Sequence, residues 1–156
     1  MQRVRLDRID RKILRGLQTN GRITNVELAK RAGISPPPCL RRVRALEEAG
    51  YIQGYHAKLD RGLLGYKEMF FALVGLKSQA QDVLRAFEDT VAGWPEVQEC
   101  HMIRGGGDFL LKVAARDKDD RDSLTMRLTS AANVLKVTTY ETIRTSKDDP
   151  GVPVTE

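Results

Sequence analysis

Residues 24–50 read T-N-V-E-L-A-K-R-A-G-I-S-P-P-P-C-L-R-R-V-R-A-L-E-E-A-G, and this stretch decides the fold of the first part of the chain. Thr24 can cap a short helix that Gly33 ends, because glycine adopts the positive φ of a sharp turn without steric cost. A second helix is predicted over residues 35–49, with Gly50 as its end. A two-turn helix is unstable alone, so its neighbours must clamp it. The spacing predicts a helix-turn-helix.

A third helix is predicted upstream of this pair. Its apolar side chains recur at helical spacing, and they are Leu6, Ile9, Ile13, Leu14 and Leu17. Asp7 stands at the capping position, and Asn20-Gly21 marks the end. After the second helix of the pair, residues 51–60 contain a glycine in an extended pattern and are predicted as a small strand or wing.

The helix over residues 35–49 has two faces. Its predicted buried stripe consists of Leu40, Val43 and Leu46. This stripe leaves Arg41 and Arg44 on the free face, with Arg42 on its flank. A planar guanidinium group can bind guanine O6 and N7 or clamp a phosphate, so this helix suits a DNA groove. The alternative is an ordinary three-helix core whose arginines are solvated.

The same helix opens with Ser35 followed by three prolines. Prolines are tolerated in the first turn, where their missing N–H is not needed. A capping serine normally accepts from the amides two or three positions ahead, which Pro37 and Pro38 lack. We therefore predict that the Ser35 hydroxyl is free to bind a phosphate.

Positive charge is concentrated at the start of the chain. Residues 1–60 carry 13 Lys or Arg against 6 Asp or Glu, a net of +7, whereas residues 61–156 carry 13 against 15, a net of −2. A basic domain fits a polyanion, because each phosphate that it neutralises releases counterions. On charge alone, a solvated surface that serves solubility is the alternative. Together with the helix-turn-helix, the charge predicts double-stranded DNA as a partner.

The remainder of the chain predicts a second architecture. The expected elements are a strand at 69–76, a helix at 80–93, strands at 97–103 and 109–115, a helix at 119–132 and a strand at 134–145. This β-α-β-β-α-β order gives an α+β, ferredoxin-like sandwich with both helices on one face of an antiparallel sheet. Phe70 or Phe71, Met102, and Leu110 or Leu111 would partly line the uncovered face. The sheet is therefore predicted to pack against that of a second subunit.

Gly105, Gly106 and Gly107 stand between the two hairpin strands, next to Asp108. Glycines expose backbone amides, and a carboxylate can hold an ammonium group, so the loop could bind both charged ends of an amino acid. A loose hairpin turn is the alternative, because the pattern is neither a G-x-G-x-x-G fingerprint nor a P-loop.

Length and composition set the organisation. The 156 residues suffice for two small domains, predicted as residues 1–60 and 67–147, with a linker at 61–66 and a flexible tail at 148–156. No apolar run is long enough to span a membrane, and the charged start holds no signal-peptide core, so a cytoplasmic location without membrane contact is expected. Two distant cysteines and two histidines predict no metal site, cofactor or catalytic residues, and hence no enzyme.

Three segments resemble the Lrp/AsnC family of leucine- or asparagine-responsive regulators, and the likeness covers nearly the whole chain. They are L-D-R-I-D-R-K-I-L at 6–14, I-S-P-P-P-C-L-R-R-V-R-A-L-E-E-A-G-Y-I at 34–52 and V-Q-E-C-H-M-I-R-G-G-G-D-F-L-L-K-V at 97–113. The most specific part is S-P-x-P-C-x-x-R-V-x-x-L-E at 35–47. The resemblance implies a winged helix-turn-helix and a ferredoxin-like effector domain that dimerises by its sheets, with dimers assembling into octameric or similar discs.

The resemblance also implies an amino-acid effector at the contact between dimers, near the loop that runs from Arg104 to Asp108. Gly105 and Asp108 match the family's usual glycine and acidic residue. Gly106 and Gly107 depart from the family, which often has an acidic or aromatic residue there.

We therefore predict a homo-oligomeric, sequence-specific DNA-binding transcription regulator whose assembly or DNA binding responds to an amino acid or related metabolite. Ser35 and Pro38 would position the third helix. The groove and phosphate contacts would come from Arg41, Arg42 and Arg44. One alternative is an effector-independent architectural DNA-binding protein. Another is a small-molecule-binding or enzymatic ferredoxin-like domain whose basic N-terminus is only an oligomerisation arm.

Overall fold

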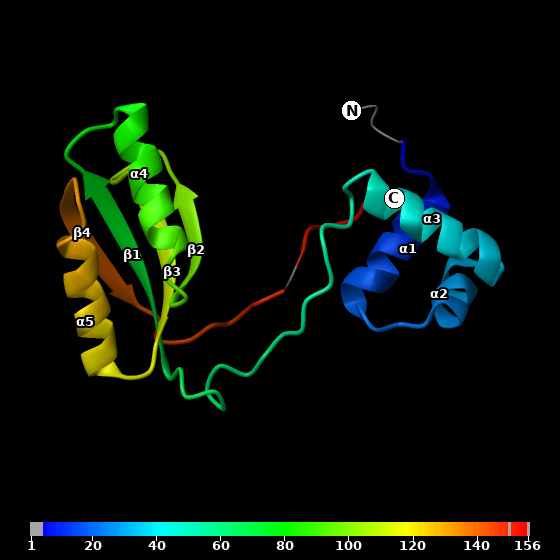
Figure 1. Ribbon diagram of the computed structural model, residues 1–156. Coiled ribbons are helices and arrows are strands. Elements are labelled where there is room, and N and C mark those ends of the chain that lie inside the picture. Colours follow the sequence, from blue (N-terminus) through cyan, green and yellow to red (C-terminus); the bar gives the residue numbers. More distant parts are fainter. Residues whose placement is uncertain (1–4, 150, 156) are drawn as a thin grey trace. The chain divides into compact units, whose positions relative to one another are not determined.

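The computed structural model describes residues 5–149 and 151–155, which divide into two compact units (Figure 1). The first unit comprises Met1–Lys58 and Lys147–Glu156, and the second comprises Leu59–Ser146. The chain thus passes between the units twice, after Lys58 and after Ser146. Residues 61–66, expected as a linker, belong to a hydrogen-bonded turn in which Asp60 accepts the amide of Leu63 at 3.0 Å.

The first unit contains the three expected helices, α1 (Arg8–Thr19), α2 (Asn25–Ala32) and α3 (Pro36–Glu48). Thr24 caps α2 by accepting the Glu27 amide at 3.2 Å. Gly33 ends α2 with a φ of 80°, and its amide donates to the carbonyl of Ala29. The core between the helices consists of Ile13, Leu28, Ala29, Ala32, Cys39 and Leu46. The helix-turn-helix is present as predicted.

Helices α1 and α2 approach closely at Gly16. A Cβ atom placed on this residue would lie 2.7 Å from Cδ1 of Leu28, so a larger side chain would force the helices apart. Glycine inside a helix usually costs stability, and here the close contact gives it a packing role.

The small strand or wing predicted at 51–60 is not paired with any strand among the described residues. The segment is extended, but a strand needs a neighbour with which to exchange backbone hydrogen bonds. It is held instead by the Tyr51 amide, which donates to the Leu46 carbonyl at 2.9 Å, and by side chains. Ile52 packs against the helical core, and the Tyr55 hydroxyl donates to Oε1 of Glu47 at 2.9 Å.

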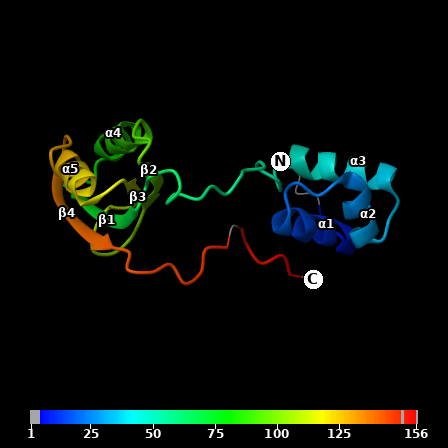
Figure 2. The same ribbon diagram turned by 90° about the horizontal axis from the view of Figure 1, so that it is seen from below.

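The second unit follows the predicted β-α-β-β-α-β order. Its elements are β1 (Glu68–Leu76), α4 (Gln81–Ala92), β2 (Val97–Met102), β3 (Phe109–Ala115), α5 (Lys118–Thr129) and β4 (Val134–Glu141). The strands form one antiparallel sheet in the order β2-β3-β1-β4. Both helices cover the same face of this sheet (Figures 1 and 2).

Alternation along the strands separates the two faces of the sheet. Phe70 is fully buried beneath the helices, whereas Phe71 and Leu110 lie on the face without helices and are half-buried. The prediction for Met102 was wrong. It pairs with Phe109, whose ring packs against Phe87 of α4, so Met102 shares the helix-covered face.

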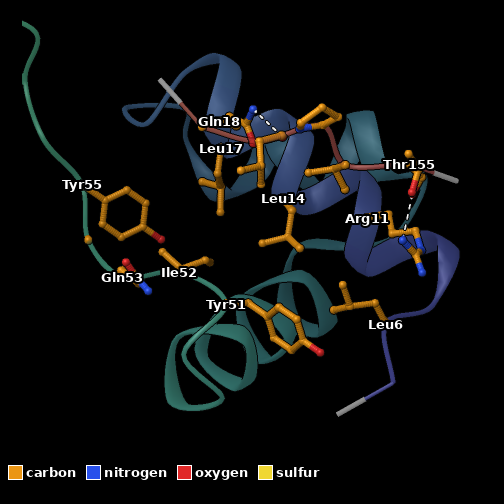
Figure 3. A pocket seen from close by; sticks show the side chains of 15 residues that line it. Leu6, Arg11, Leu14, Leu17, Gln18, Tyr51, Ile52, Gln53, Tyr55 and Thr155 are labelled. Atoms are coloured by element: carbon orange, nitrogen blue, oxygen red, sulfur yellow. Dashed lines mark hydrogen bonds between the residues drawn. The ribbon is translucent and has the colours of Figure 1, made fainter. Parts of the chain in front are cut away.

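The tail predicted to be flexible lies against the first unit (Figure 3). Gln18 donates to the carbonyl of Val152 at 3.0 Å, and Arg11 donates to that of Thr155 at 2.8 Å. The tail, α1 and residues 51–55 surround a pocket of about 570 Å³ with mainly apolar walls. The tail thus covers part of an apolar surface of α1, which explains its attachment.

Candidate nucleic-acid interface and effector loop

Helix α3 packs inward through Cys39, Val43 and Leu46. The prediction of Leu40 in this stripe was wrong, because its side chain is 41% exposed while Cys39 is fully buried. Cys39 precedes Val43 by four positions and therefore lies on the same helix face, whereas Leu40 is rotated about 100° away from Cys39.

Arg41 and Arg44 lie on the opposite face and are exposed. Within residues 5–149 and 151–155, neither forms an ion pair or a side-chain hydrogen bond. Helix α3 therefore presents two guanidinium groups whose charge and donors are available to an external acceptor.

The N-terminus of α3 begins at Ser35, which is exposed and makes no side-chain capping hydrogen bond. The prolines behind it explain this, since Pro37 and Pro38 have no amide hydrogen to donate. Asn25 of α2 donates to the carbonyl of Pro36 at 2.8 Å and so fixes the start of α3. A free hydroxyl beside a helix N-terminus favours an anion.

Arg42 differs from its two neighbours. Its Nη1 atom donates to Asp7 Oδ2 and to Asp10 Oδ1 of the α1 region, both at 2.7 Å. The hydrogen bonds from Asp10 and Asp7 raise the pKa of Arg42 above its usual value. The guanidinium charge is thus already matched inside the unit. No local spacing in the sequence indicates this pairing, because the partners lie 35 and 32 positions away.

The charge of the two units differs as the sequence predicts. The first unit holds 14 Lys or Arg against 8 Asp or Glu, a net of +6, and the second holds 12 against 13, a net of −1. The unit that contains α3 therefore carries the positive field that attracts nucleic acid.

The loop between β2 and β3 holds the residues predicted to bind an effector. Arg104, Gly105 and Gly106 are exposed, and Gly105 has a φ of 146° that disfavours side chains. Gly107 packs closely, because a Cβ there would lie 2.8 Å from Cδ1 of Leu73. The loop is fixed against β1 at Gly107 and exposed at the other two glycines.

Both oxygens of the Asp108 carboxylate accept hydrogen bonds within the second unit. One oxygen accepts the Leu76 amide at 2.7 Å and the other accepts Gln79 Nε2 at 2.9 Å. The Leu76 amide is available because the pairing of β1 with β3 ends at Val74 and Phe109, two positions before Leu76. Both donors are uncharged, so the negative charge of Asp108 is not neutralised by a cation in the described part of the chain. No local spacing in the sequence indicates these two donors, which lie 32 and 29 positions from Asp108.

The two cysteine side chains are poor candidates for catalysis. Burial raises the pKa of the Cys39 thiol, and burial together with Glu88 raises that of Cys100, which makes both poor nucleophiles. Among the described residues, no group of three His, Cys, Asp or Glu side chains is placed to hold a metal ion. No helix within them has the length and apolar character to cross a membrane.

Each of the two units matches a known protein family. Residues 6–53 match the family described as winged helix-turn-helix DNA-binding, and residues 69–152 match the Lrp/AsnC ligand binding domain.

Individual relatives extend this likeness over nearly the whole chain. A leucine-responsive regulatory protein of Rhizobium meliloti (strain 1021) is 54% identical over 147 residues, which cover 94% of each chain. A transcriptional regulator of Neisseria meningitidis, solved in complex with L-methionine, is 34% identical with a TM-score of 0.91, covering 96% of this chain and 97% of that one. A feast or famine regulatory protein of M. tuberculosis, also solved with L-methionine, is 30% identical with a TM-score of 0.84, covering 95% and 99%.

The helix-turn-helix with its exposed arginines, the sheet domain and these matches lead to one assignment, which is that of a regulator and not of an enzyme. The chain belongs to the Lrp/AsnC family of DNA-binding transcription regulators.

Proposed function

We propose that α3 enters a DNA groove, with Ser35 and Pro38 at its start and Arg41 and Arg44 as the contacting cations, while Arg42 supports the helix. One observation carries this proposal: Arg41 and Arg44 are exposed on α3 and unpaired among the described residues. Two free guanidinium groups beside a helix N-terminus supply both the charge and the donors that phosphates and guanine edges accept.

The salt dependence of DNA binding tests this proposal. The probe is a duplex that the wild-type protein selects from a random library, compared with a scrambled duplex. Arg41→Gln or Arg44→Gln should lower the slope of log Kd against log salt by about 0.9 if the residue contacts a phosphate. If it contacts a base, the variant should lose about 1–3 kcal/mol of discrimination instead.

The matched control is Arg85→Gln, which removes an exposed arginine from helix α4 of the second unit. It should leave duplex affinity, salt slope and discrimination unchanged. The proposal is wrong if Arg41→Gln and Arg44→Gln behave like this control.

We propose further that an amino acid binds at the loop of Arg104, Gly105, Gly106, Gly107 and Asp108 and modulates assembly or DNA binding. The family match of the second unit and the two L-methionine complexes of similar proteins support this proposal. The chemistry fits as well. Exposed amides at Gly105 and Gly106 suit a carboxylate, and the charge of Asp108 suits an ammonium group.

A melting-temperature screen over the twenty amino acids tests this effector. A ligand that binds only the folded state raises the melting temperature, by an amount that grows with its concentration. Asp108→Asn should reduce the shift, since it removes the charge but keeps an oxygen for the Leu76 amide. If no amino acid shifts the melting temperature, the effector-independent architectural alternative is favoured.

We also propose a homodimer formed through the sheet face that carries Phe71, Leu73 and Leu110, with dimers joining into an octamer or a similar assembly. These side chains are apolar and half-buried on the face that no helix covers. Covering them with a second copy would remove this apolar area from water. Phe71→Asp should shift the sedimentation coefficient toward that of a monomer, and an unchanged coefficient would contradict this interface.

We propose that the chain works in the cytoplasm. The similar regulator of Rhizobium meliloti is a bacterial protein, and the chromosome that a DNA-binding regulator contacts lies in the bacterial cytoplasm. Fractionation of cells that produce the full chain tests this location.

A further inference from the structure

Arg42 and two aspartates form a closed set of hydrogen bonds that joins α3 to the start of α1. The amide of Asp7 donates to Asp10 Oδ2 at 3.0 Å, and the amide of Asp10 donates to Asp7 Oδ1 at 2.8 Å. The remaining oxygens, Asp7 Oδ2 and Asp10 Oδ1, both accept from Arg42 Nη1. All four carboxylate oxygens therefore have a partner.

Burial distinguishes this set from an ordinary surface ion pair. The Asp10 side chain is only 10% exposed, and the Arg42 side chain is 37% exposed. Exposed ion pairs contribute little to stability, but without its arginine a carboxylate this buried would keep only the Asp7 amide as a partner and would have no cation beside its charge. The arginine on α3 and the capping aspartates of α1 thus depend on each other.

We propose that Arg42 is a positioning residue, which sets the rotation of α3 through Asp7 and Asp10 so that Arg41 and Arg44 face outward, and that it contacts no DNA phosphate itself. Adjacent residues on a helix are about 100° apart, so fixing Arg42 against α1 also fixes the directions of its neighbours. Asp7 and Asp10, which cap α1, accordingly have a second role, because they hold α3 in place through Arg42. This inference rests on the proposed role of Arg41 and Arg44 in DNA binding.

Arg42→Met tests the inference, because methionine is of similar length but cannot donate to a carboxylate. Affinity for the selected duplex should fall by about tenfold, with weaker discrimination against the scrambled duplex. The slope of log Kd against log salt should stay at its wild-type value, because no phosphate contact is lost. Binding is measured at a temperature at which circular dichroism shows the variant fully folded.

Asp10→Asn tests the same ion pair from the side of the carboxylate. If Arg42 is positioned by Asp10, this variant should also weaken binding, and the double variant with Arg42→Met should be no weaker than the worse single variant. If Arg42 contacted DNA, removing a nearby negative charge would tighten binding. Arg42→Lys, which keeps the charge and donors, should restore part of the affinity.

Two results would overturn the inference: a loss of about 0.9 in salt slope on Arg42→Met, or tighter binding by Asp10→Asn. Failure of the proposed function would look different. In that case Arg41→Gln and Arg44→Gln would leave binding unchanged, whatever Arg42→Met does.

Discussion

Replacing Gly107 by alanine should destabilise the second unit, because the new methyl group has no room. Its Cβ would lie 2.8 and 2.9 Å from Cδ1 and Cγ of Leu73 and 3.1 Å from the carbonyl oxygen of Val74. The leucine can rotate, but that carbonyl accepts the amide of Asp108 at 2.8 Å and is fixed by the hairpin. Overpacking of this kind costs about 1–3 kcal/mol.

Urea unfolding followed by tryptophan fluorescence measures this cost in the second unit alone, since Trp94 is the only tryptophan and is buried there. Gly106→Ala is the matched control. Its Cβ would lie 3.8 Å from Leu73, an ordinary contact, so its free energy of unfolding should stay close to that of the wild type. Adding Leu73→Ala should recover part of the loss in Gly107→Ala, relative to Leu73→Ala alone. Equal unfolding midpoints for Gly106→Ala and Gly107→Ala would refute the reasoning.

Three further outcomes follow from the first unit. Gly33→Ala should lower the free energy of unfolding by about 1 kcal/mol in urea titrations followed by helical circular dichroism, because φ is 80° there. Gly21→Ala should change it little, because the added Cβ would make only an ordinary contact with Tyr55 at 3.7 Å. The hydrogen bonds from the Asp10 amide and from Arg42 lower the pKa of Asp7 below its usual value. The carboxylate therefore contributes to the free energy of unfolding above that usual pKa, and this contribution is lost as the pH falls through the pKa of the folded state. Asp7→Asn should make the free energy of unfolding less dependent on pH in this acid range. Burial and the hydrogen bond to Glu47 raise the pKa of Tyr55 to about 12, so Glu47→Gln should lower the midpoint of its ionisation in an ultraviolet titration, and an unchanged midpoint would exclude that hydrogen bond.

Local signals in the sequence predicted most of the fold. Helical spacing, the capping residue Thr24 and the turn at Gly33 act within a few residues of one another, and so they mark helix ends without knowledge of the rest of the chain. Strand alternation likewise predicted the sheet. The errors at Leu40 and Met102 arose where the direction of one side chain depends on which neighbour the element packs against. The packing of Gly16 on Leu28 joins two helices and has no local signature.

The candidate sites were harder to predict than the fold. A charged side chain can bind a ligand only with the charge and hydrogen-bonding atoms that are not already paired within the folded chain. Arg42 and Asp108 illustrate two degrees of such pairing. Arg42 donates to two carboxylates, so its charge is matched and a phosphate would have to displace Asp7 and also Asp10, whose side chain is only 10% exposed. Asp108 accepts only from an amide and a carboxamide, so its geometry is fixed while its charge remains for a cation. A residue of the first kind orients its neighbours. A residue of the second kind can orient a loop and hold an ammonium group at once. Arg42→Met should therefore weaken DNA binding indirectly, through the positions of Arg41 and Arg44, whereas Asp108→Asn should weaken the binding of an effector directly.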